Sequence, residues 1–262
     1  MSHPRQQATG LLTSLQNPIP NEFVNCELLI IVQNTDPITA NYAGNGIWWA
    51  VHTFDDYAVY KVNATYSGLD DVEINNATIT INKANSTLTL NNIAFEYKGS
   101  GSTAVSFKGA TGVKAKVLNQ PKAKVIVKNN KITVSGLNIG TYTLSVTTIP
   151  DSDHNAVTKN VKIKVNKIKT KITAKKKTFK TKIKTKKYMI TLKDSRGNAI
   201  KNAKVTLKVK GKLFKANTNK KGQATFKITN LENKGTFKAT VMYKGNKYYN
   251  AVTKKNVQII VR

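Results

Sequence analysis

Cysteine and histidine are scarce in this chain of 262 residues. The single cysteine, Cys26, excludes an intrachain disulfide and any zinc site built from several thiolates. The three histidines lie far apart in the sequence, so none has the spacing of a metal-ligand pair or of a base beside a nucleophile. These shortages exclude a disulfide scaffold and a zinc finger, and they argue against an enzyme that depends on histidine.

Motifs of catalysis are missing too. The serines include no Gly-x-Ser-x-Gly turn, and the last third of the chain lacks the acidic pairs that a glycosidase needs. A calcium ion shared between the predicted loops of Asp70 and Asp71 and of Asp151 and Asp153 is an alternative, but neither loop alone carries enough carboxylates. We therefore expect a protein that is not an enzyme, with no catalytic residues, no cofactor and no metal.

Long hydrophobic runs are absent as well. The longest run near the start is Leu28–Val32, far short of the roughly 20 residues of a membrane helix. No basic stretch followed by an apolar one marks a signal peptide. We expect no transmembrane segment, and no export signal is visible in this sequence.

Acidic residues are few, and the charge is unevenly distributed. Lysine and arginine number 43 against 13 acidic residues, which gives a formal net charge of +30. Residues 1–83 carry a net charge of −5, residues 84–166 of +8 and residues 167–262 of +27, since the last segment has only Asp194 and Glu232 as acids. Such a segment repels itself, so we expect its lysines to face solvent or a polyanion.

Apolar and polar residues alternate from about Lys61 onward, with the period of a half-buried β-strand. The clearest cases are Ile132-x-Val134, Val161-x-Ile163-x-Val165, Val205-x-Leu207-x-Val209 and Val125-x-Val127. Turn residues recur every eight to twelve positions or so, and Asp194–Gly197 and Asn219–Gly222 are predicted to be hairpin loops with a left-handed glycine. The pattern indicates an all-β fold of antiparallel β-sandwiches.

An internal repeat divides the chain. The pentapeptide Asn-Ala-Val-Thr-Lys occurs at 155–159 and again at 250–254, 95 positions apart. Upstream of it, Gly140-Thr-Tyr142 matches Gly235-Thr-Phe237. A period of this length is that of a domain. We predict a divergent or partial β-rich unit at 1–83, a sandwich at 84–166 and a lysine-rich sandwich at 167–262.

Several segments resemble known repeat domains. NKANSTLTL at 82–90, VSGLNIGTY at 134–142 and VNKIKTKI at 165–172 resemble the tandem Ig-like repeats of adhesin-like surface proteins from methanogenic archaea. LKDSRGNAIKNAKVT at 192–206 and NTNKKGQATF at 217–226 are similar to bacterial Ig-like domains of the invasin and intimin type. The resemblance covers about residues 61–262 and implies tandem Ig-like sandwiches at the cell surface or outside the cell, where such proteins act as stalks.

The lysine run 167–187 is the strongest electrostatic feature. One interpretation is that it binds a polyanion, which releases counterions as each charge is neutralised. The other is that Ile168, Ile172, Phe179 and Ile183 face a core while the lysines coat exposed strands and protect their edges. The expected polyanion contacts are Lys175, Lys176, Lys177, Lys180, Lys182, Lys184, Lys186 and Lys187.

Asparagine and tyrosine supply the remaining candidates. Asn63, Asn76 and Asn85 each begin an Asn-x-Ser/Thr triplet and are predicted N-glycosylation sites. Tyr243, Tyr248 and Tyr249 could form a carbohydrate platform or pack against the bottom of a sandwich, and the second interpretation is favoured.

The sequence as a whole predicts a non-catalytic, adhesin-like stalk protein of the cell surface. Its cationic C-terminal domain is expected to contact an anionic cell-wall polymer or a host-surface glycan rather than a small-molecule substrate. A basic nucleic-acid-binding protein is the alternative. Arginine, the residue that best reads bases, is nearly absent from the last segment, and so are aromatic residues that could stack on bases within the run.

Overall fold

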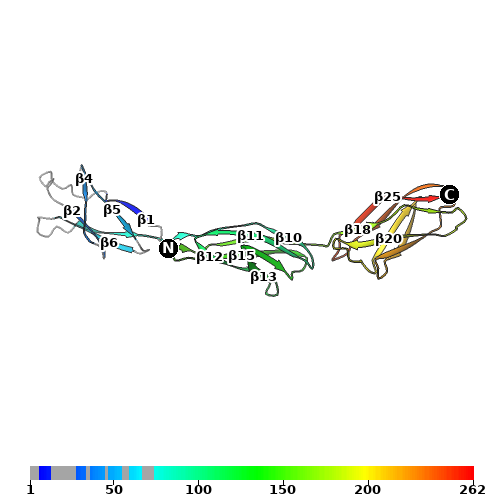
Figure 1. The fold of residues 1–262 in the computed structure, drawn as a ribbon, viewed down its shortest axis with the longest axis horizontal. Helices are drawn as coiled ribbons and strands as arrows, with labels where there is room; N and C mark the ends of the chain where they lie inside the picture. Colours follow the sequence, from blue (N-terminus) through cyan, green and yellow to red (C-terminus); the bar gives the residue numbers. More distant parts are fainter. Residues whose placement is uncertain (1–5, 13–27, 34–35, 45–46, 55–58, 67–73) are drawn as a thin grey trace. The chain divides into compact units, whose positions relative to one another are not determined.

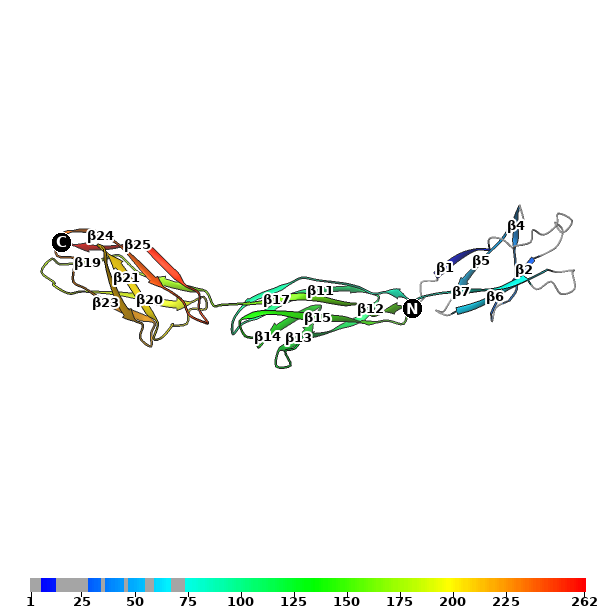
Figure 2. The same cartoon turned by 180° about the vertical axis from the view of Figure 1, so that it is seen from behind.

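The described part of the chain is built from β-strands alone, which confirms the predicted fold class of tandem Ig-like antiparallel β-sandwiches. The computed structural model describes residues 6–12, 28–33, 36–44, 47–54, 59–66 and 74–262. The chain divides into two compact units. The first holds the described part of 1–86 with 109–111 and 150–156, and the second holds the rest. Figures 1 and 2 show the strands of both units from opposite sides.

The described residues of the first unit form two sheets and a short strand pair. The three-stranded sheet has the order β1 (Gln6–Leu12), β5 (Ile47–Phe54), β4 (Asn41–Gly44). The four-stranded sheet has the order β3 (Ile38–Thr39), β2 (Leu28–Val32), β6 (Val59–Tyr66), β7 (Ile74–Thr80). The short strands β8 (Ala84–Asn85) and β16 (His154–Asn155) pair in parallel. Ile30, Val32 and Val62 are buried in this unit.

The second unit begins with a sandwich of two four-stranded sheets. One sheet has the order β10 (Ile93–Glu96), β17 (Thr158–Asn166), β15 (Gly140–Pro150), β12 (Ala110–Val117). The other has the order β13 (Lys124–Lys128), β14 (Lys131–Ser135), β11 (Ser100–Lys108), β9 (Thr87–Leu90). Alternate residues of both sheets, among them Ile132, Leu144 and Ile163, form one buried core because side chains in a strand point to opposite faces.

A second sandwich, which we call the last sandwich, occupies residues 168–262. Its smaller sheet has the order β18 (Thr170–Thr173), β20 (Lys186–Asp194), β23 (Gln223–Ile228). Its larger sheet has the order β19 (Lys177–Phe179), β25 (Val252–Val261), β24 (Gly235–Tyr243), β21 (Lys204–Val209), β22 (Lys212–Asn217). The core of this sandwich is a cluster of its own, and its centre includes Leu207, Phe226 and Ile259, each fully buried.

Both sandwiches begin in the same way. The first strand pairs antiparallel within one sheet, as β9 does with β11 and β18 does with β20. The chain then crosses to the other sheet, where β10 and β19 pair in parallel with the last strands, β17 and β25. The edge that the last strand would otherwise leave open is thereby covered.

Gly222 and Gly197 adopt the left-handed conformation predicted for them, with φ of +73° and +84°. The hairpin predicted at Asn219–Gly222 is wrong, because β22 and β23, which this turn joins, belong to different sheets. The Gly222 carbonyl accepts a hydrogen bond from the Leu192 N–H at 2.8 Å. A Cβ at Gly222 would lie 2.5 Å from the Leu192 carbonyl oxygen, so this turn needs glycine for both its φ and its space.

Gly222→Ala is expected to destabilise the last sandwich more than Gly211→Ala does. Gly211 has a similar φ of +76°, but no atom lies within 4 Å of the place that a Cβ would take there. Both variants lose about 1–2 kcal/mol to a left-handed alanine, and only Gly222→Ala adds about 1–3 kcal/mol of overpacking. Thermal denaturation of the two variants measures the difference, and equal losses of stability would contradict it.

Candidate functional site

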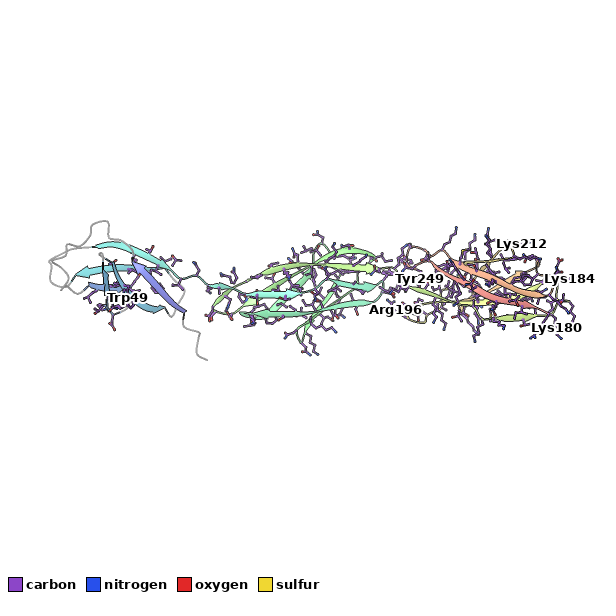
Figure 3. The ribbon with its side chains drawn as sticks, turned by 90° about the horizontal axis from the view of Figure 1, so that it is seen from above. Trp49, Lys180, Lys184, Arg196, Lys212 and Tyr249 are labelled. Atoms are coloured by element: carbon purple, nitrogen blue, oxygen red, sulfur yellow. The ribbon has the colours of Figure 1, made fainter. Side chains whose placement is uncertain are left out.

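The lysine run of the sequence is divided by the fold of the last sandwich. Lys175 and Lys176 lie between β18 and β19, and Lys177 begins β19. Lys180, Lys182 and Lys184 lie in the loop that joins β19 to β20. Figure 3 places Lys180 and Lys184 at the end of the last sandwich opposite to Arg196 and Tyr249. All of these lysines, and Lys187 as well, are exposed.

Lys186 is not available to a polyanion, contrary to the sequence prediction. It is 1% exposed, and its Nζ donates a hydrogen bond to the Ile183 carbonyl at 2.7 Å. The reason is its register, because Lys186 shares the inward face of β20 with Tyr188 and Ile190. The sequence prediction groups it with its neighbours in the run, without regard to the alternation of the strand.

The apolar residues of the run behave for the most part as core residues. Ile168, Ile172 and Phe179 are 3%, 5% and 7% exposed. Ile183 is 40% exposed, because it lies in the loop between β19 and β20 and not in a strand. The interpretation that lysines coat a strand whose other face is apolar is therefore correct for β18, where Lys171 is exposed and Ile172 is buried. In β19, Lys177 and Phe179 are two residues apart and share one face of the strand.

The exposed lysines have no carboxylate partner. In residues 167–262, all of which the structure describes, no lysine makes an ion pair. Lys177 is held by other contacts: its Nζ donates to the Lys187 carbonyl at 3.1 Å and lies 5.2 Å from the centre of the Phe179 ring. Unpaired cations keep their full attraction for an anion in solution.

Four cations that lie outside the run approach the same end of the last sandwich. The β21–β22 hairpin carries Lys210 and Lys212 towards that end, since Val209 pairs with Ala239, four residues along β24 from Gly235. Lys234 immediately precedes Gly235, which pairs with Val261, and Arg262 follows Val261. We define the cationic pole as Lys180, Lys182, Lys184, Lys210, Lys212, Lys234 and Arg262, all of them exposed. Sequence reasoning missed the last four, because only strand register brings them to the run.

The loops of the cationic pole are hydrogen-bonded to one another. The Thr181 N–H donates to the Arg262 carbonyl at 2.9 Å, and the Arg262 N–H donates to the Phe179 carbonyl at 3.0 Å. Asn230 joins two further loops, because its Nδ2 donates to the Val209 carbonyl at 3.2 Å and to the Lys210 carbonyl at 3.3 Å. The lysines are therefore presented by turns of defined conformation.

Tyr188 is the most deeply buried tyrosine of the last sandwich. It is 1% exposed, and its hydroxyl donates to the Lys175 carbonyl at 2.7 Å. Burial raises the pKa of Tyr188 from 10.0 to about 12. The folded state therefore favours the neutral phenol, and this contribution to stability is complete below pH 10 and is lost as the pH rises from 10 towards 12.

Tyr188→Phe is expected to flatten the alkaline part of the pH–stability profile. The variant also loses a hydrogen bond, at about 1 kcal/mol near neutral pH, so the slope of stability against pH is the informative quantity. Denaturant titrations between pH 9 and about pH 12 measure it for the wild type, Tyr188→Phe and the control Tyr248→Phe, whose side chain is 39% exposed. A slope unchanged by Tyr188→Phe would contradict the assignment.

The three tyrosines that were considered for a carbohydrate platform differ in how far they are exposed to solvent. Tyr243 is 4% exposed, and its hydroxyl is buried without a hydrogen-bond partner. Burial, and next the neighbouring Tyr249, raise the pKa of Tyr243. Tyr248 is 39% exposed and Tyr249 is half-buried. Tyr243 packs in the core, as the structural interpretation expects.

Asp151 organises a loop of the first unit. Its Oδ1 lies 2.6 Å from His154 Nδ1 and accepts the Asp153 N–H at 3.0 Å. The hydrogen bond to His154 is the main cause that lowers the pKa of Asp151. The described residues contain no cluster of three or more metal-binding side chains. Asp70 and Asp71 lie outside the described residues.

The predicted glycosylation sites lie on strands of the first unit. Asn63 in β6 and Asn85 in β8 are exposed, while the side chain of Asn76 in β7 lies outside the described ones. Ser86, the middle residue of the Asn85 triplet, is buried, and its Oγ donates to the Gly109 carbonyl at 2.7 Å. The use of these asparagines stays a prediction. The described strands and loops include no helix with the length and hydropathy of a bilayer span.

Comparison with known proteins gives a likeness to tandem β-domains. No family model and no curated protein matches the sequence. The crystal structure of titin domains z1z2 in complex with telethonin is 10% identical with a TM-score of 0.37, over 70% of this chain and 98% of that chain. Drosophila N-cadherin EC1-3 is 11% identical with a TM-score of 0.28, over 90% of this chain and 89% of that chain.

A third solved structure is a Ca2+-stabilised adhesin that helps an Antarctic bacterium to reach out and bind ice. It is 13% identical with a TM-score of 0.31, over 90% of this chain and 66% of that chain. Identities and TM-scores this low carry no argument about what the present chain binds. The fold of the chain is evident from its own sheets and cores.

Proposed function

We propose that this chain is a non-catalytic, adhesin-like segment of a cell-surface protein whose last sandwich contacts anionic polymers. The observation that carries the proposal is the distribution of charge in residues 167–262. Lysines cover the exposed positions of a closed apolar core, and none is neutralised by a carboxylate. A surface of this kind attracts polyanions over several ångströms and repels cations.

The proposal also includes a division of the chain into three domains. We retain a divergent or partial β-rich unit at 1–83, an Ig-like sandwich at 84–166 and a lysine-rich Ig-like sandwich at 167–262. The separate cores of the second unit support the boundary near residue 167. The similarity of residues 61–262 to repeats of methanogen adhesin-like proteins supports a location at the cell surface or outside the cell, where cell-wall polymers and host glycans are the available anions.

Retention of the full chain on immobilised polymers tests the proposal. We expect retention at about physiological salt on a cell-wall preparation rich in carboxylate or phosphate groups, and none on uncharged dextran. Duplex DNA is the second ligand, because a basic nucleic-acid-binding protein is the alternative. Failure to bind any anionic wall polymer would refute the proposal, and tight binding to duplex DNA alone would favour the alternative.

A further inference from the structure

The strand registers of the two sandwiches allow a comparison of equivalent positions. Phe95 of β10 pairs in parallel with Val165, and Phe179 of β19 pairs in parallel with Val261. Gly140 pairs with that same Val165, and Gly235 pairs with that same Val261. These pairings identify corresponding ends of the two sandwiches.

The residues next to these pairs differ in charge. In the sandwich that ends at residue 166, the residues next to these pairs are Glu96, Ile139 and Asn166. In the last sandwich, the equivalent residues are Lys180, Lys234 and Arg262. Three equivalent positions thus change from a net charge of −1 to one of +3, so the cationic pole is a local property of the last sandwich and not a consequence of its fold.

An open groove lies at this pole. It has a volume of about 620 Å³ and is lined by Thr178, Phe179, Lys180, Thr181, Lys182 and Arg262. In Figure 3, Lys184 lies at this end of the sandwich, and Lys212 lies nearer to this end than Arg196 and Tyr249 do. The segments 180–185, 210–212, 229–234 and Arg262 carry seven exposed cations and a single acid, Glu232.

The chemistry of the groove favours a polysaccharide over a nucleic acid. Threonine hydroxyls can donate hydrogen bonds to sugar hydroxyls and accept hydrogen bonds from them. The Phe179 ring is 7% exposed and is covered by Lys177, so the groove offers no free aromatic face on which a base could stack. Lysine acts as a point charge and accepts carboxylate, sulfate and phosphate without the geometric demand of an arginine fork.

We propose that the cationic pole is the site at which the last sandwich binds an anionic polysaccharide. This inference rests on the proposed function and narrows the binding site to the cationic pole. The other exposed lysines of the sandwich contribute only to its overall electrostatic attraction for anions. The hydrogen bonds of Thr181 and Arg262 hold the groove in shape before the polymer arrives, so little ordering is needed on binding.

Two triple variants of the full chain test the site. The pole variant carries Lys180→Gln, Lys234→Gln and Arg262→Gln. The matched control carries Lys171→Gln, Lys193→Gln and Lys204→Gln, which are exposed residues near the ends of β18, β20 and β21 away from the pole and remove the same charge. Affinity for polygalacturonate and for heparin is measured against salt concentration, with thermal denaturation to verify that each variant is folded.

The pole variant is expected to bind at least about tenfold more weakly at low salt, and the slope of log affinity against log salt is expected to fall by about two. The control is expected to change that slope by less than about one. Equal losses in the two variants would overturn the pole as the site and leave the proposed function intact. No binding of the wild type to either polymer would overturn the proposed function as well, and tighter binding to duplex DNA would overturn the polysaccharide as ligand class.

Discussion

Leu207→Ala is expected to unfold the last sandwich at a temperature lower by roughly 10–30 °C. Leu207 is fully buried at the centre of β21, between β24 and β22. Truncating a buried leucine costs about 3–5 kcal/mol, from lost apolar burial and from the cavity that remains. In a domain of about 100 residues, each kcal/mol lowers the melting temperature by several degrees.

The matched variant is Leu144→Ala, in the core of the other sandwich. Leu144 is also fully buried, and it belongs to a separate hydrophobic cluster. Differential scanning calorimetry of the full chain should show a different transition shifted in each variant. A shift of the same transition in both would mean that the two cores unfold together, and it would contradict the proposed boundary near residue 167.

Retention of the chain on an anionic wall polymer is expected to fall on the order of 10³-fold between 50 and 200 mM salt. This magnitude follows if six or seven cations each displace a counterion from the polymer on binding, as the number of exposed cations at the pole allows. Each neutralised charge contributes slightly less than one to the slope of log affinity against log salt.

The measurement is a salt titration on the immobilised polymer, with uncharged dextran as the control surface. Apolar attraction would respond in the opposite direction, because excluded salts strengthen burial of apolar surface. Retention that is constant or increases with salt would show that the lysines do not carry the interaction. The 39% exposed Tyr248 would then be the first aromatic contact to examine by substitution.

The strands of the last two-thirds of the chain could be predicted well because alternation determines which face is buried. Ile132 and Val134 are buried as expected, and so are Val205, Leu207 and Val209. The prediction is wrong for Val127, which is 41% exposed. It lies in the edge strand β13, and alternation alone does not distinguish an edge strand from an internal one.

The candidate site could be predicted only in part. The run 175–187 correctly indicated exposed lysines, but Lys186 faces inward, and four cations of the pole, Lys210, Lys212, Lys234 and Arg262, were missed. Their convergence depends on pairings between segments far apart in the sequence, such as Phe179 with Val261. The repeat of 95 positions did indicate which strand ends of the two sandwiches are equivalent, because it relates Gly140 to Gly235.

The parallel pairing of β19 with β25 determines how the last sandwich responds to a pulling force. Tension applied through the two ends of the sandwich pulls β19 and β25 past each other along their own axes. The hydrogen bonds between the two strands are then loaded together instead of one after another. The pairing of β10 with β17 has the same geometry. In both sandwiches, therefore, the hydrogen bonds of this strand pair resist extension together.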